Sequence, residues 1–259
     1  MDTSTPLMRV HNLTHAFGRV LACADVSFEL HSGEVLGVVG ESGSGKTTLL
    51  NCISARLAPT NGIVEYDLRG RGLTDIYALS EPERRLLLRT DWGVVMQNPR
   101  DGLRMDVSAG GNVGERLMAV GARHYGAIRR EAEDWLSKVE LDLGRTDDKP
   151  KHFSGGMQQR LQIARNLVTK PRLVFMDEPT GGLDVSVQAR LLDLLRGLVR
   201  ELRLSAIIVT HDPAVARLLA DRLMVMKDGR VVETGLTDQV LDDPHHPYTQ
   251  LLVSSVLQV

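Results

Sequence analysis

The first stretch that could perform chemistry is GESGSGKT, residues 40–47. Its glycines let backbone N–H groups turn inward around phosphate oxygens, its lysine supplies positive charge, and its threonine hydroxyl can ligate Mg²⁺. An apolar run, GEVLGVVG, precedes it, and KTTLLNCISARL follows with helical apolar spacing, which is the strand–loop–helix context of a phosphate-binding loop (P-loop). A glycine turn capping an ordinary helix is the alternative. We expect nucleotide binding by Gly40, Glu41, Ser42, Gly43, Ser44, Gly45, Lys46, Thr47 and Thr48.

Two carboxylates end a second apolar run, LVFMDE. Asp177 would hold Mg²⁺, largely through water, and Glu178 would polarise an attacking water as general base. A charged strand end facing solvent is the alternative. The P-loop favours the catalytic interpretation over that alternative, because we expect the two motifs at the ends of neighbouring strands.

Two more polar residues follow apolar runs. His211 follows AIIVT, a position that favours contact with the γ-phosphate over a structural role. Gln97 follows WGVVM, where an amide can contact Mg²⁺ or the attacking water, although a loop glutamine alone is weak evidence. We therefore predict a catalytic set of Lys46, Glu178, His211 and Gln97, and a Mg²⁺-binding set of Thr47, Gln97 and Asp177.

A second candidate anion site lies in FSGGMQQRLQIARN. Ser154, Gly155 and Gly156 lead into a helix predicted from about Met157, so backbone amides and the helix dipole point at an anion. A simple serine N-cap is the alternative. Because this helix begins in a different part of the chain from the P-loop, we expect Ser154 to reach the nucleotide of a second copy. That arrangement is a twofold dimer with two shared sites.

Alternating strands and helices position these motifs. The opening residues predict two short strands joined near Gly18, and amphipathic helices occupy about 79–148 as an insert. The run VSVQARLLDLLRGLVRELRL predicts a long helix with an apolar stripe. SAIIVTHD predicts a buried strand, and a hairpin is predicted about Asp228-Gly229. The stripe consists of Leu191, Leu195, Leu198 and Leu202. The expected fold is α/β with a mainly parallel sheet and ligands at the carboxyl ends of its strands.

Composition narrows the class of protein. The 259 residues, 42% of them hydrophobic and 25% charged, suit one globular domain. A net charge of -2 does not indicate nucleic-acid binding through overall charge. No apolar run approaches the ~18 residues of a membrane span, so we expect membrane contact only through a partner. Cys23 and Cys52 lie far apart in sequence, and no secretory signal opens the chain, so we expect a cytoplasmic location.

These motifs, in this order, together with GGLD at residues 181–184, closely resemble the ATP-binding cassette ATPases. The resemblance implies a P-loop NTPase of one domain, with ATP and Mg²⁺ as cofactors and a head-to-tail dimer. Its ATP-binding core would span about 1–78 and 160–240, its helical subdomain about 79–159 and its C-terminal segment about 241–259.

The family resemblance also implies roles for residues outside the P-loop. Ser154 and Gly156 would meet the opposite ATP, and Asp184 would bridge the two sites. Phe17 stands where the family stacks an aromatic, usually tyrosine, on adenine. Met157 replaces a usual glutamine, which should weaken a polar contact to the partner's nucleotide without abolishing phosphate binding.

Two narrower resemblances suggest different partners. PTGGLDVSVQARLL and DDPHHPYTQLLVSS are similar to ATPases of dipeptide and oligopeptide importers. The two histidines of this tail could suggest a metal site, but the prolines and Tyr248 favour a packed C-terminal segment. The stretch QNPRDGLRMDVSAGGNVGERLMAVGARHYG is more similar to the ATP-binding subunits of bacterial carbon–phosphorus lyase systems. That resemblance implies work in phosphonate breakdown with a soluble lyase core complex.

Three functional classes therefore remain at this point. The first is an ATPase of a carbon–phosphorus lyase system, and the second is the ATPase of a peptide, nickel or phosphonate importer, peripheral at the inner membrane. A DNA-repair or translation cassette is disfavoured by the single cassette and the lack of a basic stripe. Residues 104–125, rich in glycine and arginine, are either a docking surface for the partner or a solvated face. Charge reversal at Arg116 and Arg123 would separate those two.

Overall fold

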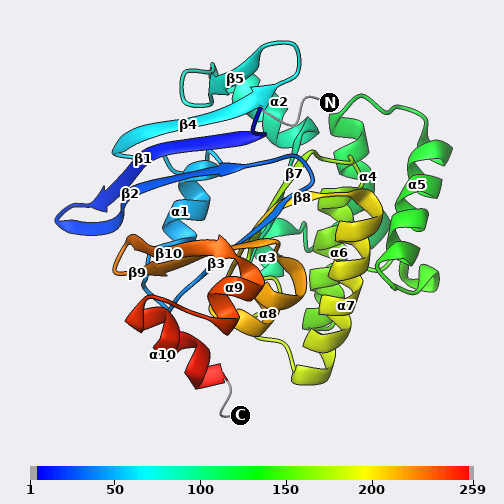
Figure 1. Ribbon diagram of the computed structural model, residues 1–259. Helices are drawn as coiled ribbons and strands as arrows, with labels where there is room; N and C mark the ends of the chain where they lie inside the picture. The colour runs from blue at the N-terminus through cyan, green and yellow to red at the C-terminus, as the bar shows by residue number, and fades with distance from the viewer. Residues whose placement is uncertain (1–4, 257–259) are drawn as a thin grey trace. The chain divides into compact units, whose positions relative to one another are not determined.

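The computed structural model describes residues 5–256, which form two compact units. The first unit combines residues 5–84 with 199–256, and the second comprises residues 85–198. The helices α2 (Glu81–Thr90) and α7 (Val185–Leu202) contain the positions where the units divide. Figure 1 labels most of the elements of both units.

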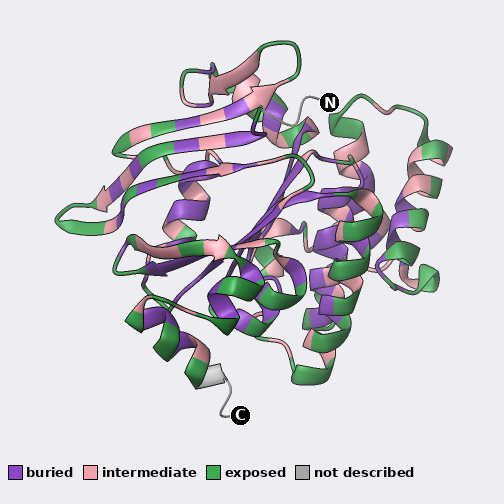
Figure 2. Cartoon of the chain, in the orientation of Figure 1, coloured by how far each residue is buried: buried purple, intermediate pink, exposed green. Residues whose placement is uncertain are grey.

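An antiparallel sheet in the first unit has the strand order β2-β1-β4-β5. Its strands are β1 (Met8–Phe17), β2 (Val20–Leu30), β4 (Asn61–Leu68) and β5 (Gly72–Asp75). Buried and exposed residues alternate loosely along β1, as expected for a sheet with one covered face (Figure 2). The predicted turn near Gly18 and the antiparallel N-terminal part are confirmed. The strands β4 and β5 were not predicted.

A second set of strands in this unit is mainly parallel. The central strand β3 (Val35–Val39) pairs in parallel with β8 (Ser205–Thr210) on one side and β9 (Arg222–Lys227) on the other. The strand β10 (Arg230–Leu236) pairs antiparallel with β9, with Asp228 and Gly229 at positive φ in the predicted hairpin. Every residue of β3 and β8 is buried, which is typical of parallel strands covered on both faces.

Four further helices belong to the first unit: α1 (Lys46–Ile53), α8 (Pro213–Leu219), α9 (Thr237–Asp242) and α10 (Pro247–Val256). The helix α1 ends before the run predicted for it, because Ala55 adopts positive φ. The C-terminal residues Tyr248 and Leu252 join a buried cluster with Val39, Val225 and Leu241. The predicted packing of the C-terminal segment is therefore confirmed for its described residues.

The second unit contains the predicted helical insert. Its strands β6 (Trp92–Val95) and β7 (Leu173–Asp177) pair in parallel. Its helices, apart from α2 and α7, are α3 (Pro99–Gly102), α4 (Ala109–Ala119), α5 (Tyr125–Lys138), α6 (Gly155–Leu167) and the short 3₁₀ turns Leu143–Arg145 and Pro150–His152. The stripe of α7 is buried at Leu191, Leu195 and Leu198, whereas Leu202 is half-buried. The mixed α/β fold class is confirmed.

Candidate nucleotide-binding site

The P-loop follows β3 and is shaped by its glycines. Gly40, Gly43 and Gly45 have φ values of 152°, 85° and 97°. A Cβ atom on Gly40 would lie 2.2 Å from the Met226 carbonyl oxygen, and one on Gly45 would lie 2.0 Å from the Ala22 carbonyl oxygen. The conformation and the close backbone approach therefore require glycine at both positions.

The helix after the loop presents its N-terminus without a side-chain cap. Among residues 5–256 no side chain caps α1, whereas Ser108, His124 and Ser154 cap α4, α5 and α6. The buried Lys46 ammonium donates hydrogen bonds to the carbonyl oxygens of Gly40 and Glu41, both at 2.7 Å. An uncapped helix N-terminus beside a buried lysine is an environment that suits a phosphate group.

His211 lies at the same strand edge as the P-loop. Val39 and Thr210 are paired at the ends of the parallel strands β3 and β8, so Gly40 and His211 directly follow adjacent residues. His211 is exposed, and the Asp212 side chain caps α8. The structure thus brings together two of the motifs that the sequence predicts at the phosphate edge.

The prediction that the LVFMDE strand neighbours the P-loop strand is wrong. Both sides of β3 are occupied, by β8 and by β9. The partner of β7 in the second unit is β6. Strand order depends on long-range pairing, which apolar runs alone do not specify.

The predicted adenine platform is exposed at the end of β1. Phe17 is 54% exposed and makes an edge contact with the His15 ring, with 4.6 Å between centroids. It pairs with Val20 in the hairpin, and Ala22 of the same hairpin contributes the carbonyl that faces Gly45. An exposed aromatic face on a strand that adjoins the P-loop has the chemistry needed to stack on a base.

In the second unit, the structure brings Gln97 close to the acidic strand end. Asp177 is the buried last residue of β7, and Glu178 follows it with φ 43°, a left-handed conformation that is costly for a non-glycine residue. A Cβ on Gly181 would contact the Glu178 carbonyl oxygen at 3.2 Å and the Gln97 amide nitrogen at 3.8 Å. Strained backbone of this kind concentrates at functional sites.

The Ser-Gly-Gly segment begins α6 two residues earlier than predicted. The Ser154 hydroxyl caps this helix by accepting from the Met157 N–H at 3.4 Å. A Cβ on Gly156 would lie 2.5 Å from Val187 of α7, so this glycine permits close helix packing. The exposed Asp184 immediately precedes α7, and its carbonyl accepts from the Gln188 N–H. Ser154 is therefore an N-cap, which was the alternative to an anion-binding role. The residue is also exposed.

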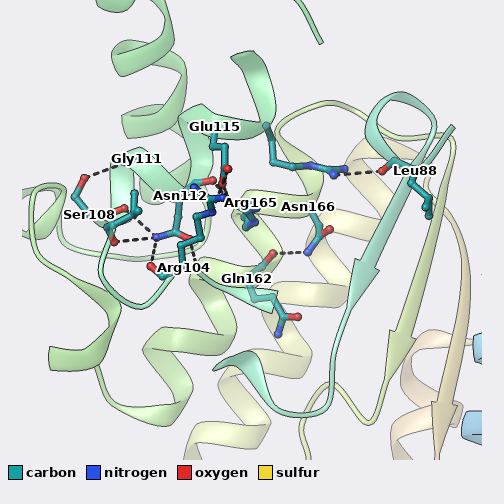
Figure 3. A network of polar contacts seen from close by, with 11 residues as sticks. Leu88, Arg104, Ser108, Gly111, Asn112, Glu115, Gln162, Arg165 and Asn166 are labelled. Atoms are coloured by element: carbon teal, nitrogen blue, oxygen red, sulfur yellow. Dashed lines mark hydrogen bonds and ion pairs between the residues drawn. The ribbon is translucent and has the colours of Figure 1, made fainter. Parts of the chain in front are cut away.

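Buried carboxamides connect α6 to the strand that precedes Gln97. Gln162 accepts from the Met96 N–H at 2.6 Å and donates to the Met96 carbonyl at 3.1 Å. Asn166 accepts from the Val94 N–H. It also donates to the Gln162 carbonyl (Figure 3). We refer to Gln162 and Asn166 as the amide ladder. The amide ladder is not among the predicted features, although the run QQRLQIARN places both residues on one helix face.

A second polar cluster holds the beginning of α4. The fully buried Asn112 donates to the carbonyls of Arg104, Val107 and Ser108, and Arg165 donates to the Asn112 carbonyl and to Glu115 (Figure 3). This network fixes the conformation of the insert.

Arg116, proposed above as a docking probe, donates to the Leu88 and Trp92 carbonyls. Burial, followed by the charges of Arg165 and Arg89, lowers its pKa to about 10. Arg116 therefore supports the insert, and a charge reversal there tests folding rather than docking. Arg123 is exposed and remains a suitable probe.

The chain matches known proteins along most of its length. The family model described as ABC transporter matches residues 23–181. The chain is 71% identical over 253 residues to the Putative phosphonates utilization ATP-binding protein PhnK of Escherichia coli K12, covering 98% of each chain. The chain belongs to the ATP-binding cassette family. As a cassette ATPase, it hydrolyses ATP.

Two other comparisons extend this result. The dipeptide transport ATP-binding protein DppF of Escherichia coli K12 is 39% identical over 236 residues, which cover 91% of this cassette and 69% of DppF. A dimeric structure of the cassette MJ0796 bound to ADP and Pi is 31% identical, with a TM-score of 0.79, and the match covers 89% of this chain and 98% of that one. A second family model, oligopeptide/dipeptide transporter C-terminal region, matches residues 232–259. Within the described residues, no helix is both long and apolar enough to span a bilayer.

Proposed function

We propose that this ATPase is the cassette subunit of a carbon–phosphorus lyase system and acts in phosphonate breakdown. The observation that supports this most is the 71% identity to PhnK along nearly the whole of both chains. The dipeptide transport protein DppF is 39% identical. The partner would be a lyase core complex, and the protein would act in the cytoplasm.

The working form is a head-to-tail dimer. Relatives of 31% identity have been solved as dimers, one of them with ADP and Pi. Ser154, Gly155 and Gly156 of one copy would contact the nucleotide bound by the other, and Asp184 would link the two sites. The exposed positions of Asp184 and of Val185, which is 84% exposed, are consistent with contact to a second copy.

Each predicted residue has a distinct role toward ATP. The P-loop amides and Lys46 bind the phosphates, and Phe17 stacks on adenine. Glu178 accepts a proton from the attacking water, and His211 stabilises charge that develops on the γ-phosphate. Nucleotide binding favours the closed dimer, so that phosphate loss reopens it and transmits a conformational change to the lyase core.

Mg²⁺ would be held by the Thr47 hydroxyl, the Asp177 carboxylate and the Gln97 amide oxygen. These are oxygen ligands of the kind that Mg²⁺ prefers, and Asp177 is placed by a buried strand with Gln97 near the same strand end. When bound, the ion would neutralise charge on the β- and γ-phosphates.

The docking surface for the lyase core would be residues 104–125. Around it, a cavity of about 220 Å³ is lined by glycines of α4 together with Met118, Arg123 and Tyr125. Met118 is 47% and Tyr125 73% exposed, and both are apolar groups beside an exposed arginine. Exposed apolar groups beside a charge are typical of protein-binding surfaces.

A specific observation favours the importer alternative. The C-terminal region of oligopeptide and dipeptide transporters matches residues 232–259. An importer ATPase would use the same catalytic residues and would differ only in binding a membrane-spanning permease.

Purification of the native complex separates the two proposals. A tagged copy expressed at natural levels should co-purify with lyase subunits, and Arg123→Glu should weaken that association. Arg196→Glu, an exposed position on α7, is the matched control. Recovery of a multispanning permease instead, or unchanged lyase recovery with Arg123→Glu, would refute the partner or the docking surface respectively.

A further inference from the structure

The peptide group that joins Gly40 to Glu41 is held from both sides. Its N–H, which belongs to Glu41, donates to the Tyr248 hydroxyl at 2.9 Å. Its carbonyl, which belongs to Gly40, accepts from the Lys46 ammonium at 2.7 Å. Because a peptide group is planar, fixing its N–H also fixes the direction of its carbonyl. Tyr248 therefore orients the acceptor that Lys46 contacts at the beginning of the P-loop.

Packing restrains the Tyr248 side chain. It is 6% exposed and belongs to the buried cluster that includes Val39, the residue immediately before Gly40. The Lys227 ammonium lies 5.0 Å from the centre of its ring, within the range of a cation–π contact. Burial also raises the pKa of Tyr248, so its hydroxyl is protonated at neutral pH.

The residues before Tyr248 are fixed by hydrogen bonds. The backbone N–H groups of His245 and His246 donate to the Glu233 carboxylate at 2.9 and 3.0 Å. The His246 imidazole accepts from the Tyr248 N–H at 3.1 Å, which caps the start of α10. The histidine pair thus positions the tyrosine through backbone groups and a cap.

Backbone hydrogen bonds hold the opposite side of the P-loop. The Gly229 N–H donates to the Ser44 carbonyl at 3.1 Å, and the Gly229 carbonyl accepts from the Ala24 N–H. Carbonyl oxygens of Ala22 and Met226 exclude side chains at Gly45 and Gly40. The contact made by the Tyr248 hydroxyl can thus be removed by deleting one oxygen atom, without changing the sequence of the P-loop.

We propose that Tyr248 is a positioning residue for nucleotide binding, acting through the Gly40–Glu41 peptide on Lys46. The C-terminal segment that contains it is then part of the ATP-binding apparatus. This inference depends on ATP binding, not on the identity of the partner complex, so its failure and that of the proposed function are distinguishable.

The test is Tyr248→Phe in the full chain. ATP affinity is measured by equilibrium binding, stability by thermal unfolding, and the mobility of residues 40–45 by amide hydrogen exchange. Loss of one hydroxyl partner of a partly buried N–H should raise the Kd for ATP about 3- to 10-fold and accelerate exchange in the P-loop. The ATPase rate at saturating ATP should change less than about twofold, because Tyr248 touches no reacting atom.

Tyr77→Phe is the matched control. The Tyr77 hydroxyl lies 2.7 Å from the Leu57 carbonyl oxygen and also contacts the Cys52 carbonyl, at the end of α1 opposite the P-loop. Its loss should lower the melting temperature and leave the Kd for ATP unchanged. The proposal is overturned if Tyr248→Phe behaves like Tyr77→Phe, with a lower melting temperature but wild-type ATP affinity and P-loop exchange.

Discussion

The P-loop region of the first unit and the Gln97–α6 region of the second are stabilised by different means. Glycine conformations, backbone carbonyls and one tyrosine hydroxyl define the P-loop. In the second unit, buried carboxamides of Gln162 and Asn166 bond to the backbone of Met96 and Val94. A loop that must bind a fixed phosphate shape is built from backbone, whereas a loop connected to a helix is held by side chains.

The difference has a mechanical consequence. Gln162 forms two side-chain hydrogen bonds with Met96, the residue before Gln97, and Gln162 lies on the helix that Ser154 caps. We therefore expect a displacement of Gln97 to be transmitted to α6 through these two hydrogen bonds, of 2.6 and 3.1 Å. Side chains connect the P-loop to α1 through Lys46 and to α10 through Tyr248, and we expect it to stay nearly fixed during turnover.

The largest effect is expected from Glu178→Gln in the second unit. Loss of a general base should reduce the ATPase rate about 10²- to 10⁴-fold while ATP binding is retained. The variant should accumulate as an ATP-loaded dimer, detectable by size-exclusion chromatography with ATP and Mg²⁺. Glu201→Gln, at an exposed position on α7, should behave like wild type. An ATPase rate within about twofold of wild type would remove Glu178 from the catalytic set.

Gly45→Ala tests whether the P-loop depends on backbone approach. Its Cβ would lie 2.0 Å from the Ala22 carbonyl oxygen at φ 97°, so we expect destabilisation of roughly 2–3 kcal/mol and loss of ATP affinity of at least about 10-fold. Gly33→Ala is the matched control, because φ is also positive, at 80°, and among described residues nothing lies within 4 Å of its Cβ. It should cost only about 1 kcal/mol. Equal unfolding curves and ATP affinities for the two variants would contradict the steric argument.

The same contrast explains which features could be predicted from sequence. The P-loop, the hairpin at Asp228-Gly229 and the buried strands follow from local spacing and glycine positions, so pattern reasoning finds them. The position of β7, the strands β4 and β5 and the amide ladder depend on pairing between distant segments. Tyr248 could be predicted only in part. The run HHPYT indicates that the segment packs, but the contact of Tyr248 with Glu41 joins residues 207 positions apart.

Gln162→Leu tests the amide ladder. Leucine fills a similar volume but leaves the Met96 N–H and carbonyl without this partner, so the free energy of unfolding should fall by about 2–3 kcal/mol. The ATPase rate at saturating ATP should fall as well, because Gln97 is no longer tied to α6.

Asn166→Leu is the matched control for Gln162→Leu. It removes a similar bond, to Val94, farther from Gln97. Both variants should lose stability in thermal unfolding, but only Gln162→Leu should slow turnover. Equal ATPase rates in the two variants would show that the ladder stabilises the unit without coupling Gln97 to α6.

The smallest effect concerns Glu233, a carboxylate that holds backbone in the first unit as the amides do in the second. Burial alone would raise its pKa, but the hydrogen bonds it accepts outweigh burial and lower its pKa below the ordinary 4.5. A lowered folded-state pKa stabilises the protein above pH 4.5, and this contribution is lost as pH falls through the folded-state value. Because the group is partly solvated, we expect less than about 1 kcal/mol.

Thermal unfolding of Glu233→Gln against wild type, from pH 7 to pH 3, measures this contribution. The stability difference should be constant at neutral pH and shrink below pH 4.5, the reverse of what a raised pKa would give. If Glu233 fixes the turn before Tyr248, the variant should also bind ATP more weakly at pH 7, where the carboxylate is charged. A pH-independent difference in stability with unchanged ATP affinity would mean that the Glu233 carboxylate acts by shape alone and not through its charge.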